Sequence, residues 1–445
     1  MKKISILGAG LSATSLIDYL LEHAESNNWM ISIGDFDENI AKVKAHNNPR
    51  SKSFQFDVNN SAQIEEVVST SDIVVSMLPA SFHLIIAESC VKHKKQMLTA
   101  SYVSPAIKNL DAKAKEAGIG IYMELGVDPG IDHMSAMRII DQLRKDGSTL
   151  NGFYSSTGGL VAPEYDNNPW NYKFTWNPRN VVLAGQGVSM FIRNGNYKYI
   201  PYHRLFKRTI HTSIEGVGEF EIYPNRDSLK YRETYGLEDI PTIYRGTMRR
   251  VGYSKAWNIF VQLGVTDDTY VIENSAEMNF RQFINTFLPY AEETSVEEKL
   301  KNLFSDVLDE DIMLKLEWLD IFKEIPIPLV KASPAKILQY ILERKWQLDP
   351  EDKDMIAMQH RFEFTTKDQV KKRIISSLVV KGESKEKTAM AITVGTPLAI
   401  ATKMVANGTL QLTGVQVPVI PEMYNPILNE LEELGIQFSE VETEL

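Results

Sequence analysis

The sequence predicts an α/β protein in which a doubly wound parallel sheet is followed by a mixed-sheet α+β domain that carries a small helical subdomain. Three observations predict this fold class. Short apolar runs alternate with helical patterns over the first third of the chain. The pattern then becomes β-rich with glycine turns, and from residue 279 to 350 it becomes helical and acidic. The 445 residues are enough for two or three domains.

The first domain, residues 1–130, is expected to hold six parallel strands with helices between them. The apolar runs that predict the strands lie at 4–7, 30–34, 53–56, 73–78, 97–100 and 119–123. Apolar residues at helical spacing indicate helices at 13–24, 64–68, 82–91 and 106–117. This order of strands and helices predicts a Rossmann-type sheet.

The second domain, residues 131–278 and 351–394, is expected to contain a mixed or antiparallel sheet. Its β-rich segments lie at 150–159, 181–193, 208–223, 253–263, 355–364 and 373–380, and turns are expected at 158–159, 194–196 and 216–218. Aromatic residues at every second position from Trp170 to Trp176 predict a further strand with an aromatic face in the core. Residues 279–350 are predicted to form the helical subdomain, with separate helices at 278–287 and 295–304. Late helices are expected at 395–405 and 425–434.

Composition argues against several classes of protein. A net charge of −10 is unfavourable for nucleic acid or anionic lipid, so neither a nucleic-acid nor a membrane partner is expected. No stretch reaches the roughly 18 unbroken apolar residues of a membrane helix, and the first residues lack the core of a signal peptide. The single cysteine, Cys90, is predicted to be a small buried side chain, which agrees with a cytoplasmic location. No H-E-x-x-H motif or Cys/His cluster occurs, so no metal is expected.

A glycine turn lies directly after the first predicted strand and directly before an amphipathic helix. Residues 8–13, GAGLSA, match the G-x-G-x-x-A pattern of dinucleotide-binding sheets. Gly8 permits the tight turn, Gly10 lets a pyrophosphate approach the backbone, and Ala13 lets helix and strand pack closely. We therefore expect a nicotinamide dinucleotide here, with a plain tight turn as the alternative.

Acidic residues follow the second and third predicted strands. Asp35 lies where an acid accepts hydrogen bonds from the adenosine ribose, and its carboxylate would repel a 2′-phosphate. Asp35 therefore favours NAD over NADP, although Asp37 is close enough to compete for this role. Asp57 follows the third strand, where side chains meet the adenine ring, and the cap of a following helix is its alternative role.

A further motif follows the sixth predicted strand, at the carboxyl edge where the nicotinamide and the reacting carbon should meet. Residues 124–133, ELGVDPGIDH, resemble the E-x-G-x-D-P-G-I-D-H signature of the saccharopine dehydrogenases, specifically the glutamate-forming enzymes also called saccharopine reductases. Other segments resemble the same family in the same order: TASYVSPA at 99–106, GGLVAPE at 158–164, YKFTW at 172–176, YPNRDS at 223–228, YRGTMR at 244–249, AITVG at 391–395 and LTGV at 412–415. The resemblance therefore covers nearly the whole chain.

The resemblance implies a Rossmann domain to which the C-terminal segment 395–445 returns, and a homodimer formed through the mixed-sheet domain. It implies oxidation of L-saccharopine, with NAD or NADP and water, to L-glutamate and 2-aminoadipate 6-semialdehyde, or the reverse condensation, in lysine metabolism. The residues that it implies as saccharopine contacts are Ser101, Tyr102, Arg226, Arg245, Gly246 and Thr247. Those that it implies as dinucleotide contacts are Leu11, Ser12 and Ala13 in the glycine turn, then Asp57, Val58, Leu78, Val127 and Asp128.

The residue types support these roles to different degrees. A substrate with three carboxylates on an acidic protein needs fixed bidentate donors, for which Arg226 and Arg245 are suited, with a surface salt bridge as the alternative. The proton transfers need a group near the reacting carbon, and Asp128 is the first candidate, ahead of Tyr102 and His133. Asp128 also begins an Asp-Pro-Gly sequence, so a plain turn is its alternative.

Two other functions fit parts of this pattern. A carboxynorspermidine dehydrogenase shares the Rossmann frame and similar imine chemistry, but it should lack the combination of Arg226, Arg245 and Thr247. A catalytically silent dinucleotide-binding protein would bind NADH without turning over saccharopine.

Overall fold

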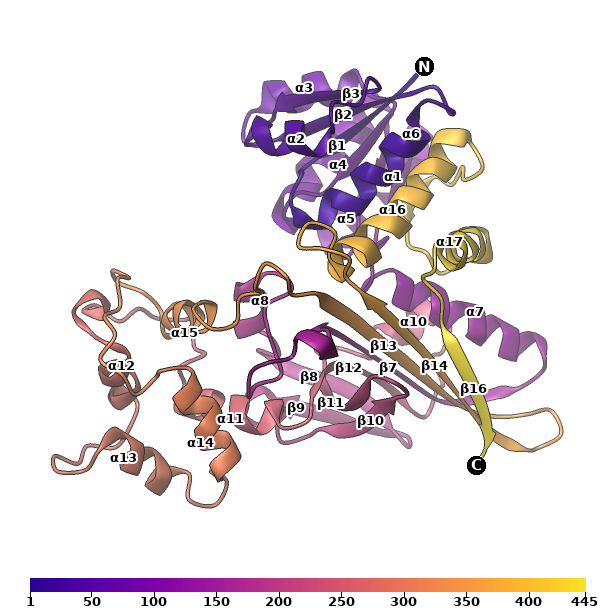
Figure 1. The fold of residues 1–445 in the computed structure, drawn as a ribbon. Coiled ribbons are helices and arrows are strands. Elements are labelled where there is room, and N and C mark those ends of the chain that lie inside the picture. The colour runs from indigo at the N-terminus through magenta and orange to yellow at the C-terminus, as the bar shows by residue number, and fades with distance from the viewer. The chain divides into compact units, whose positions relative to one another are not determined.

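The computed structural model describes residues 1–445, which divide into two compact units (Figure 1). Unit 1 comprises Met1–Leu150, Phe364–Lys372 and Leu378–Leu445. Unit 2 comprises Asn151–Glu363 and Arg373–Ser377. The C-terminal part of the chain therefore belongs to the same unit as the N-terminal part.

Unit 1 is built on a parallel sheet of seven strands in the order β15-β6-β5-β4-β1-β2-β3. Its strands are β1 (Lys2–Leu7), β2 (Trp29–Asp35), β3 (Ser51–Gln55), β4 (Ile73–Ser76), β5 (Gln96–Leu98), β6 (Gly120–Tyr122) and β15 (Gly414–Gln416). All six predicted strands are present, and the predicted Rossmann-type sheet is confirmed. The strand order reverses beside β1, which is where ligands bind in open α/β sheets.

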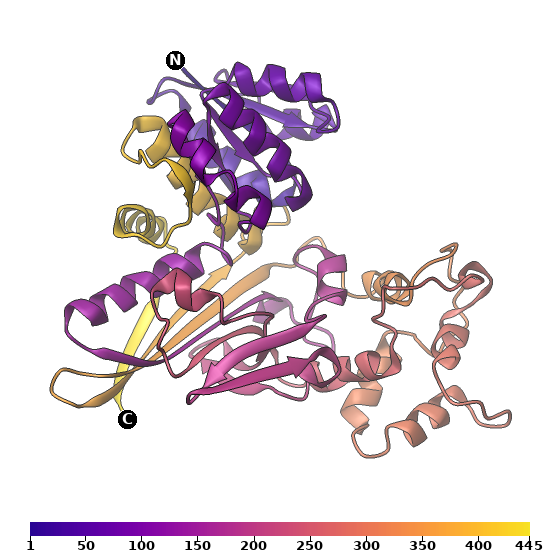
Figure 2. The same cartoon turned by 180° about the vertical axis from the view of Figure 1, so that it is seen from behind.

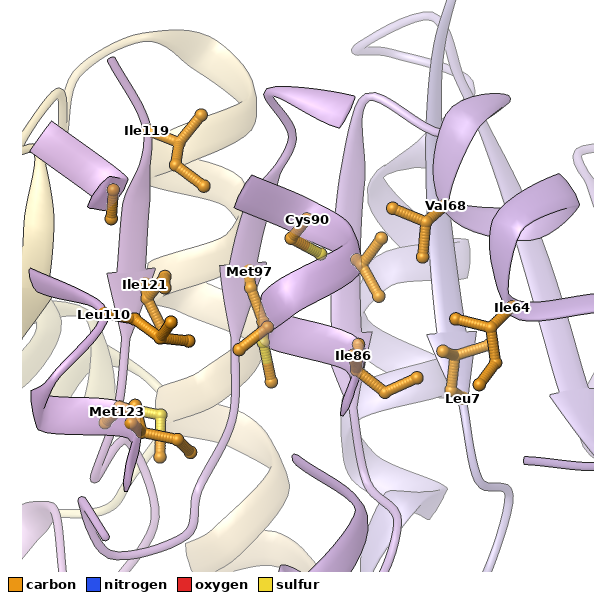
Figure 3. Close-up of a cluster of buried hydrophobic side chains, with 14 of the residues drawn as sticks. Leu7, Ile64, Val68, Ile86, Cys90, Met97, Leu110, Ile119, Ile121 and Met123 are labelled. Carbon is orange, nitrogen blue, oxygen red and sulfur yellow. The ribbon is translucent and has the colours of Figure 1, made fainter. Parts of the chain in front are cut away.

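Helices cover both faces of this sheet. The helices of unit 1 are α1 (Thr14–Ala24), α2 (Glu38–Lys44), α3 (Ser61–Ser69), α4 (His83–His93), α5 (Pro105–Lys108), α6 (Asp111–Ala117), α7 (Ile131–Lys145), α16 (Ala389–Asn407) and α17 (Pro421–Glu433), of which α7 and α17 pack on each other. Figures 1 and 2 show α1 and α16 side by side on one face, with α3 and α4 on the other. Figure 3 shows Cys90 and Ile86 of α4 in the apolar core, between Met97 of β5 and Val68 of α3. The predicted burial of Cys90 is therefore confirmed.

The long helix α16 is a core element. A Cβ on Gly395 would lie 2.7 Å from the backbone nitrogen of Leu16, so glycine permits the close packing of α16 on α1. By length and composition alone α16 could cross a membrane, but 83% of its most apolar stretch is buried inside the protein. Burial of this kind is typical of the central helix of a folded domain.

The boundaries of the units differ from the predicted domain boundaries. Residues 131–150, which include α7, belong to unit 1 because α7 packs against α17 there. The Tyr424 hydroxyl donates to Asp141 at 2.7 Å, and Arg138 pairs with Glu432. The C-terminal return to unit 1 begins at residue 378 rather than 395, and residues 279–350 are part of unit 2 rather than a unit of their own.

The second sheet is mixed, as predicted, and has nine strands. Its order is β10-β11-β12-β7-β13-β14-β16, and β8 pairs with β12 and β9. These strands are β7 (Thr149–Val161), β8 (Val188–Arg193), β9 (Asn196–Pro201), β10 (Ile210–Ile214), β11 (Gly218–Pro224), β12 (Ile243–Arg250), β13 (Asp354–Thr365), β14 (Lys371–Lys381) and β16 (Ser439–Glu444). The pair β12 and β7 is parallel, whereas β10, β11 and β12 are antiparallel neighbours.

The helices of unit 2 include the predicted helical segment. They are α8 (Pro178–Val182), α9 (Tyr202–Leu205), α10 (Tyr231–Tyr235), α11 (Tyr253–Leu263), α12 (Phe280–Thr286), α13 (Val296–Leu303), α14 (Glu310–Trp318) and α15 (Pro334–Glu343). Capping boxes begin two of them, with Asn279 at the start of α12 and Ser295 at the start of α13. The helices predicted at 278–287 and 295–304 are therefore confirmed.

The predicted strand at 253–263 is wrong, because this segment is the helix α11. Its aromatic residues recur at helical spacing: Tyr253 stacks on Trp257 at 5.7 Å between ring centroids, and Trp257 contacts Phe260. Gly264 ends the helix in the left-handed conformation at φ +86°. Nearly every residue of α11 is buried, which obscures the polar face that would have marked a helix.

Three smaller expectations are also wrong. The first residues of the segment 181–193 belong to helix α8 rather than to a strand. Gly158 lies inside β7 and not in a turn, and a Cβ there would lie 2.6 Å from the carbonyl oxygen of Met248, so glycine permits the close approach of β12. The aromatic segment from Trp170 to Trp176 is irregular and not a strand, although Trp170 and Tyr172 are buried against Trp346 as a core face would be.

Candidate active site

The glycine turn between β1 and α1 has the backbone that a dinucleotide site needs. Gly8 has φ +99°, and a Cβ there would lie 2.8 Å from the carbonyl oxygen of Met77. A Cβ on Gly10 would meet no atom within 4 Å, so this side of the turn is open. Gly10 precedes the 3₁₀ turn η1 (Leu11–Ala13), and no side chain caps the N–H groups there. Such N–H groups at the start of a helix are suited to a pyrophosphate.

The two acids after β2 have different surroundings. Asp35 is the last residue of β2, and its Oδ2 accepts the N–H of Ala9 at 2.7 Å, within the glycine turn. Asp37 is the N-cap of α2, and its Oδ1 accepts the N–H of Asn39 at 2.9 Å. Asp35 therefore lies at the glycine turn, whereas Asp37 stabilises a helix, and the contact of Asp35 with the ribose stays a prediction.

Lys44 also contacts the glycine turn, and sequence reasoning missed it. Its Nζ donates to the carbonyl oxygen of Gly10 and, at 2.8 Å, to Oγ1 of Thr14. Burial lowers the pKa of this half-buried amine. The residue ends α2 far from the turn in sequence, so no local motif could reveal the contact.

Asp57 forms a turn of its own after β3. Its Oδ1 accepts the backbone N–H of Asn59 at 2.9 Å, whereas the cap of α3 is Asn60. The predicted role of Asp57 as the cap of that helix is therefore wrong. Val58 and Leu78 are half-buried against the apolar core of unit 1, and their contacts with a dinucleotide stay predictions.

Two loops at the carboxyl edges of β5 and β6 are bound to each other. The N–H of Glu124 donates to the carbonyl oxygen of Ser101 at 3.0 Å, and that of Leu125 donates to Thr99 at 3.2 Å. The carboxylate of Glu124 also accepts the N–H of Val103 at 2.9 Å. The segment from Ser101 to Val103 is therefore held from the side of β6.

The structure brings the two predicted catalytic residues together. The Tyr102 hydroxyl donates to Oδ1 of Asp128 at 2.8 Å. Tyr102 is 41% exposed, whereas Val127, the residue before Asp128, is buried. The loop that carries Asp128 closes tightly, because a Cβ on Gly130 would lie 2.0 Å from the carbonyl oxygen of Gly126. A phenol and a carboxylate in one hydrogen bond beside solvent are suited to carry protons to and from water.

His133, the third candidate for proton transfer, is buried. Its Nε2 lies 2.7 Å from Oε2 of Glu124, whose other oxygen binds Val103. The side chain of His133 is fully inaccessible to solvent. This position suits a residue that holds Glu124, and it does not suit proton exchange with water.

A second histidine, His83, contacts a predicted substrate residue, and sequence reasoning did not identify it. Its Nε2 lies 2.7 Å from Oγ of Ser101, and its Nδ1 lies 2.9 Å from Oγ of Ser76. Burial lowers the pKa of His83 to about 4, so the imidazole is neutral at ordinary pH. The only signal in the sequence is the position of His83 shortly after the fourth strand. The other candidate residues of unit 1 likewise lie at or just after the ends of their own strands.

In unit 2, Arg226 is the most available of the predicted carboxylate ligands. It follows β11, it is exposed, and its guanidinium makes no hydrogen bond or ion pair within the chain. Its backbone is fixed by the N–H of Met190, which donates to the carbonyl oxygen of Arg226 at 2.7 Å. The predicted alternative, a surface salt bridge, is therefore wrong for Arg226.

Arg245, Gly246 and Thr247 lie on β12. The guanidinium of Arg245 is buried and stacks on the ring of Tyr231, 3.9 Å from its centroid. Thr247 is half-buried on the same face of the strand as Arg245. A Cβ on Gly246 would lie 2.2 Å from Cγ2 of Ile222, so glycine is required for β11 and β12 to pack.

The predicted site residues thus form one set on unit 1 and another on unit 2. Unit 1 carries the glycine turn beside the point where the strand order reverses, an acid at the end of β2, and a tyrosine–aspartate pair at the carboxyl edge. This fold and this site define an oxidoreductase that uses a nicotinamide dinucleotide.

Comparison with known proteins identifies the family. Residues 4–121 match the saccharopine dehydrogenase NADP binding domain, and residues 126–436 match the saccharopine dehydrogenase C-terminal domain. The chain is 32% identical to the saccharopine dehydrogenase [NADP(+), L-glutamate-forming] of Schizosaccharomyces pombe, over 99% of both chains. It belongs to the saccharopine dehydrogenase family.

Two further relatives show the extent of the similarity. The apo saccharopine dehydrogenase (L-Glu forming) of Saccharomyces cerevisiae superposes with a TM-score of 0.91 at 29% identity, over 100% of both chains. The mitochondrial alpha-aminoadipic semialdehyde synthase of Rattus norvegicus is 32% identical over 98% of this chain. The chain spans 47% of the length of that protein, whereas it spans nearly all of the fungal enzymes.

Proposed function

We propose that this protein is an L-glutamate-forming saccharopine dehydrogenase of lysine metabolism. It would oxidise L-saccharopine with a nicotinamide dinucleotide and water to L-glutamate and 2-aminoadipate 6-semialdehyde, or catalyse the reverse condensation. The observation that carries the proposal is the hydrogen bond between Tyr102 and Asp128 at the carboxyl edge of the dinucleotide-binding sheet. The end-to-end similarity to L-glutamate-forming enzymes supports it.

The residues of unit 1 fit a dinucleotide. The open side of Gly10 and the N–H groups of Leu11 and Ser12 would bind the pyrophosphate, and Asp35 would accept the ribose hydroxyls. When bound, the nicotinamide accepts a hydride from the carbon beside the secondary amine of the substrate.

The protein's own side chains supply the proton transfers. The secondary amine must be neutral before it is oxidised to the imine, and the water that adds to the imine must lose a proton. Tyr102 has an exposed hydroxyl that donates to Asp128, so the pair can pass a proton from the substrate side to the carboxylate. The same proton can return to the departing nitrogen when the carbinolamine breaks down to glutamate and the semialdehyde.

Three carboxylates distinguish saccharopine from most amine substrates. Arg226 has an exposed guanidinium with no partner in the chain, which suits a bidentate bond to one of them. Arg245 has a guanidinium whose plane is fixed by Tyr231, so its donors point in defined directions. Ser101 offers a hydroxyl at the carboxyl edge of the first sheet.

We further propose that NAD is preferred over NADP. Asp35 supports this preference, because its carboxylate is held by Ala9 at the end of β2, where an acid in this fold meets the adenosine ribose and would repel a 2′-phosphate. The ammonium of Lys44 donates to Gly10 and Thr14 within the same turn, and its charge attracts the carboxylate of Asp35.

A homodimer and a cytoplasmic location complete the proposal. Strand β9 supports the dimer, because it pairs only with β8 and carries the half-exposed Tyr197 and Tyr199. The single cysteine supports a reducing compartment. Sedimentation of the purified chain at several concentrations tests the dimer, and a monomer at all of them would refute it.

A steady-state assay of the purified chain with L-saccharopine and each oxidised dinucleotide tests the activity. We expect glutamate and 2-aminoadipate 6-semialdehyde, identified by mass spectrometry, with higher kcat/KM for NAD. Formation of lysine and 2-oxoglutarate would overturn the assigned carbon of oxidation. Dinucleotide binding without turnover would identify a silent binding protein instead.

A further inference from the structure

We propose that His83 is a positioning residue that orients the hydroxyl of Ser101 so that it donates a hydrogen bond to a carboxylate oxygen of the substrate. The inference rests on the proposed function, because that function makes Ser101 a contact of saccharopine. It adds a residue to the site, and it specifies which kind of atom Ser101 recognises.

His83 connects two strand ends of unit 1. It begins α4, shortly after β4, and only 1% of the residue is exposed. Its Nδ1 lies 2.9 Å from Oγ of Ser76, and its Nε2 lies 2.7 Å from Oγ of Ser101 and 3.5 Å from Oγ1 of Thr99, so the closest partner of Nε2 is Ser101. Ser76 ends β4, and Ser101 lies in the loop after β5. The imidazole therefore bridges a rigid strand and a loop of the site.

The surroundings of Ser76 determine which nitrogen of His83 carries the proton. A neutral imidazole has one N–H donor and one acceptor nitrogen. Ser76 is fully buried, and its hydroxyl has no hydrogen-bond partner other than Nδ1 of His83. If Nδ1 carried the proton, the buried Ser76 proton would face no acceptor, which is unfavourable. Ser76 therefore donates to Nδ1, and Nε2 carries the ring proton.

This tautomer fixes the role of Ser101. Nε2–H donates to Oγ of Ser101, so the hydroxyl proton of Ser101 points away from His83. Ser101 is half-exposed, and its proton is then offered to a ligand. A carboxylate oxygen accepts such a proton, whereas an ammonium group cannot. The opposite tautomer would direct the Ser101 proton to His83 and leave only lone pairs for the substrate.

The burial of His83 keeps this arrangement constant. Burial lowers the pKa of the imidazole to about 4, so the ring stays neutral across the pH range of an enzyme assay. Both hydrogen bonds therefore keep their direction under assay conditions.

Nitrogen NMR of the full-length protein, labelled in its histidine rings, tests the tautomer without any need for activity. The chain has eight histidines, and the signals of His83 are those absent from the His83→Asn variant. We expect a proton on Nε2 and none on Nδ1. A proton on Nδ1 would overturn the proposal.

Two substitutions separate the contacts of His83. A glutamine amide reaches the position of Nε2 and can still donate to Ser101, whereas an asparagine amide reaches only the position of Nδ1, beside Ser76. We expect His83→Asn to raise KM for saccharopine about tenfold, with kcat changed by less than about threefold. His83→Gln should retain most of the affinity. Equal losses in both variants, with unchanged melting temperatures, would refute the role.

A double-variant cycle tests whether His83 acts through Ser101. If it does, His83→Asn should add little to the loss already caused by Ser101→Ala. If the losses of affinity for saccharopine caused by the two single substitutions multiply in the double variant, His83 acts by another route and the proposal is overturned. Absence of turnover in the unmodified enzyme would refute the proposed function instead, and the NMR result would still decide the tautomer.

Discussion

Replacing Asp35 by asparagine should reverse the preference for NAD. The side chain lies at the glycine turn, where its Oδ2 accepts the N–H of Ala9 at 2.7 Å. An asparagine oxygen can keep that bond, while the variant loses the negative charge and the bond that Oδ1 of Asp35 accepts from the N–H of Asp37 at 3.1 Å. An unchanged melting temperature shows that a change in cofactor preference reports the charge and not a collapsed site.

The expected magnitude follows from two effects. Hydrogen bonds to a charged group contribute about 1 kcal/mol more than those to a neutral one, so the kcat/KM for NAD should fall by a factor of about five to ten. A carboxylate about 4 Å from a 2′-phosphate costs at least ~1 kcal/mol per unit charge, and the phosphate carries nearly two charges. Loss of that repulsion should raise kcat/KM for NADP about thirtyfold. The ratio of the two should change more than a hundredfold.

The assay compares kcat/KM for both dinucleotides at saturating saccharopine. Asp37→Asn is the matched control, because it removes the same charge two residues away, where Asp37 only caps α2. Asparagine is an equally good cap, so this variant should leave both preference and stability unchanged. An unchanged preference in Asp35→Asn, or an equal change in both variants, would refute the assignment of Asp35 to the ribose.

Four further predictions follow from the contacts described above. Tyr102→Phe removes the hydroxyl that donates to Asp128, so kcat should fall about 10²-fold while NADH binding, measured by fluorescence, is retained; an unchanged kcat would contradict the proton-transfer role. Arg226→Ala should raise KM for saccharopine at least tenfold and shift Tm by less than about 2 °C, because this exposed guanidinium has no partner in the chain. Trp257→Ala should lower the free energy of unfolding in urea by about 3–5 kcal/mol, because the side chain is buried among aromatic rings. Burial raises the pKa of the Cys90 thiol, so iodoacetamide near pH 8 should label the unfolded chain and spare the native one.

The sheet of unit 1 could be predicted from sequence because most of its strands are short apolar runs that alternate with helical patterns. Its glycine turn is specified locally as well, since Gly8 and Gly10 act through their own backbone. The seventh strand, β15, could not be predicted in this way. It is three residues long, and it pairs with β6 from almost 300 residues away in sequence, so no local period marks it.

Fully buried aromatic segments misled the sequence analysis in unit 2. A pattern reveals a helix or a strand by the contrast between a buried and an exposed face. In α11 that contrast is nearly absent, because residues on all sides of the helix are buried. From Trp170 to Trp176 the alternation is real, but the rings are ordered by contacts with distant residues such as Trp346 and not by a strand ladder.

Within the candidate site, the sequence indicated candidate residues but not how their side chains are supported. Tyr102 and Asp128 were predicted from separate motifs, and their hydrogen bond depends on β5 and β6 being neighbours. His83 was missed because its partners, Ser76 and Ser101, lie on two other strand ends. Contacts of this kind arise only when the carboxyl edges of parallel strands converge, and no spacing along the chain specifies them.

The motif at residues 124–133 is mainly a support for Asp128. Glu124 binds the backbone of Val103 and pairs with the buried His133, while the carboxylate of Asp132 accepts the N–H of Gly130 at 2.7 Å. None of these contacts needs a substrate, yet together they fix the loop that presents Asp128 to Tyr102. A single carboxylate on a mobile loop would be a poor proton acceptor, because its distance to the donor would vary. In the proposed mechanism, most of the residues that carry the family resemblance in this segment therefore hold Tyr102 and Asp128 in place, and Asp128 is the one that would act.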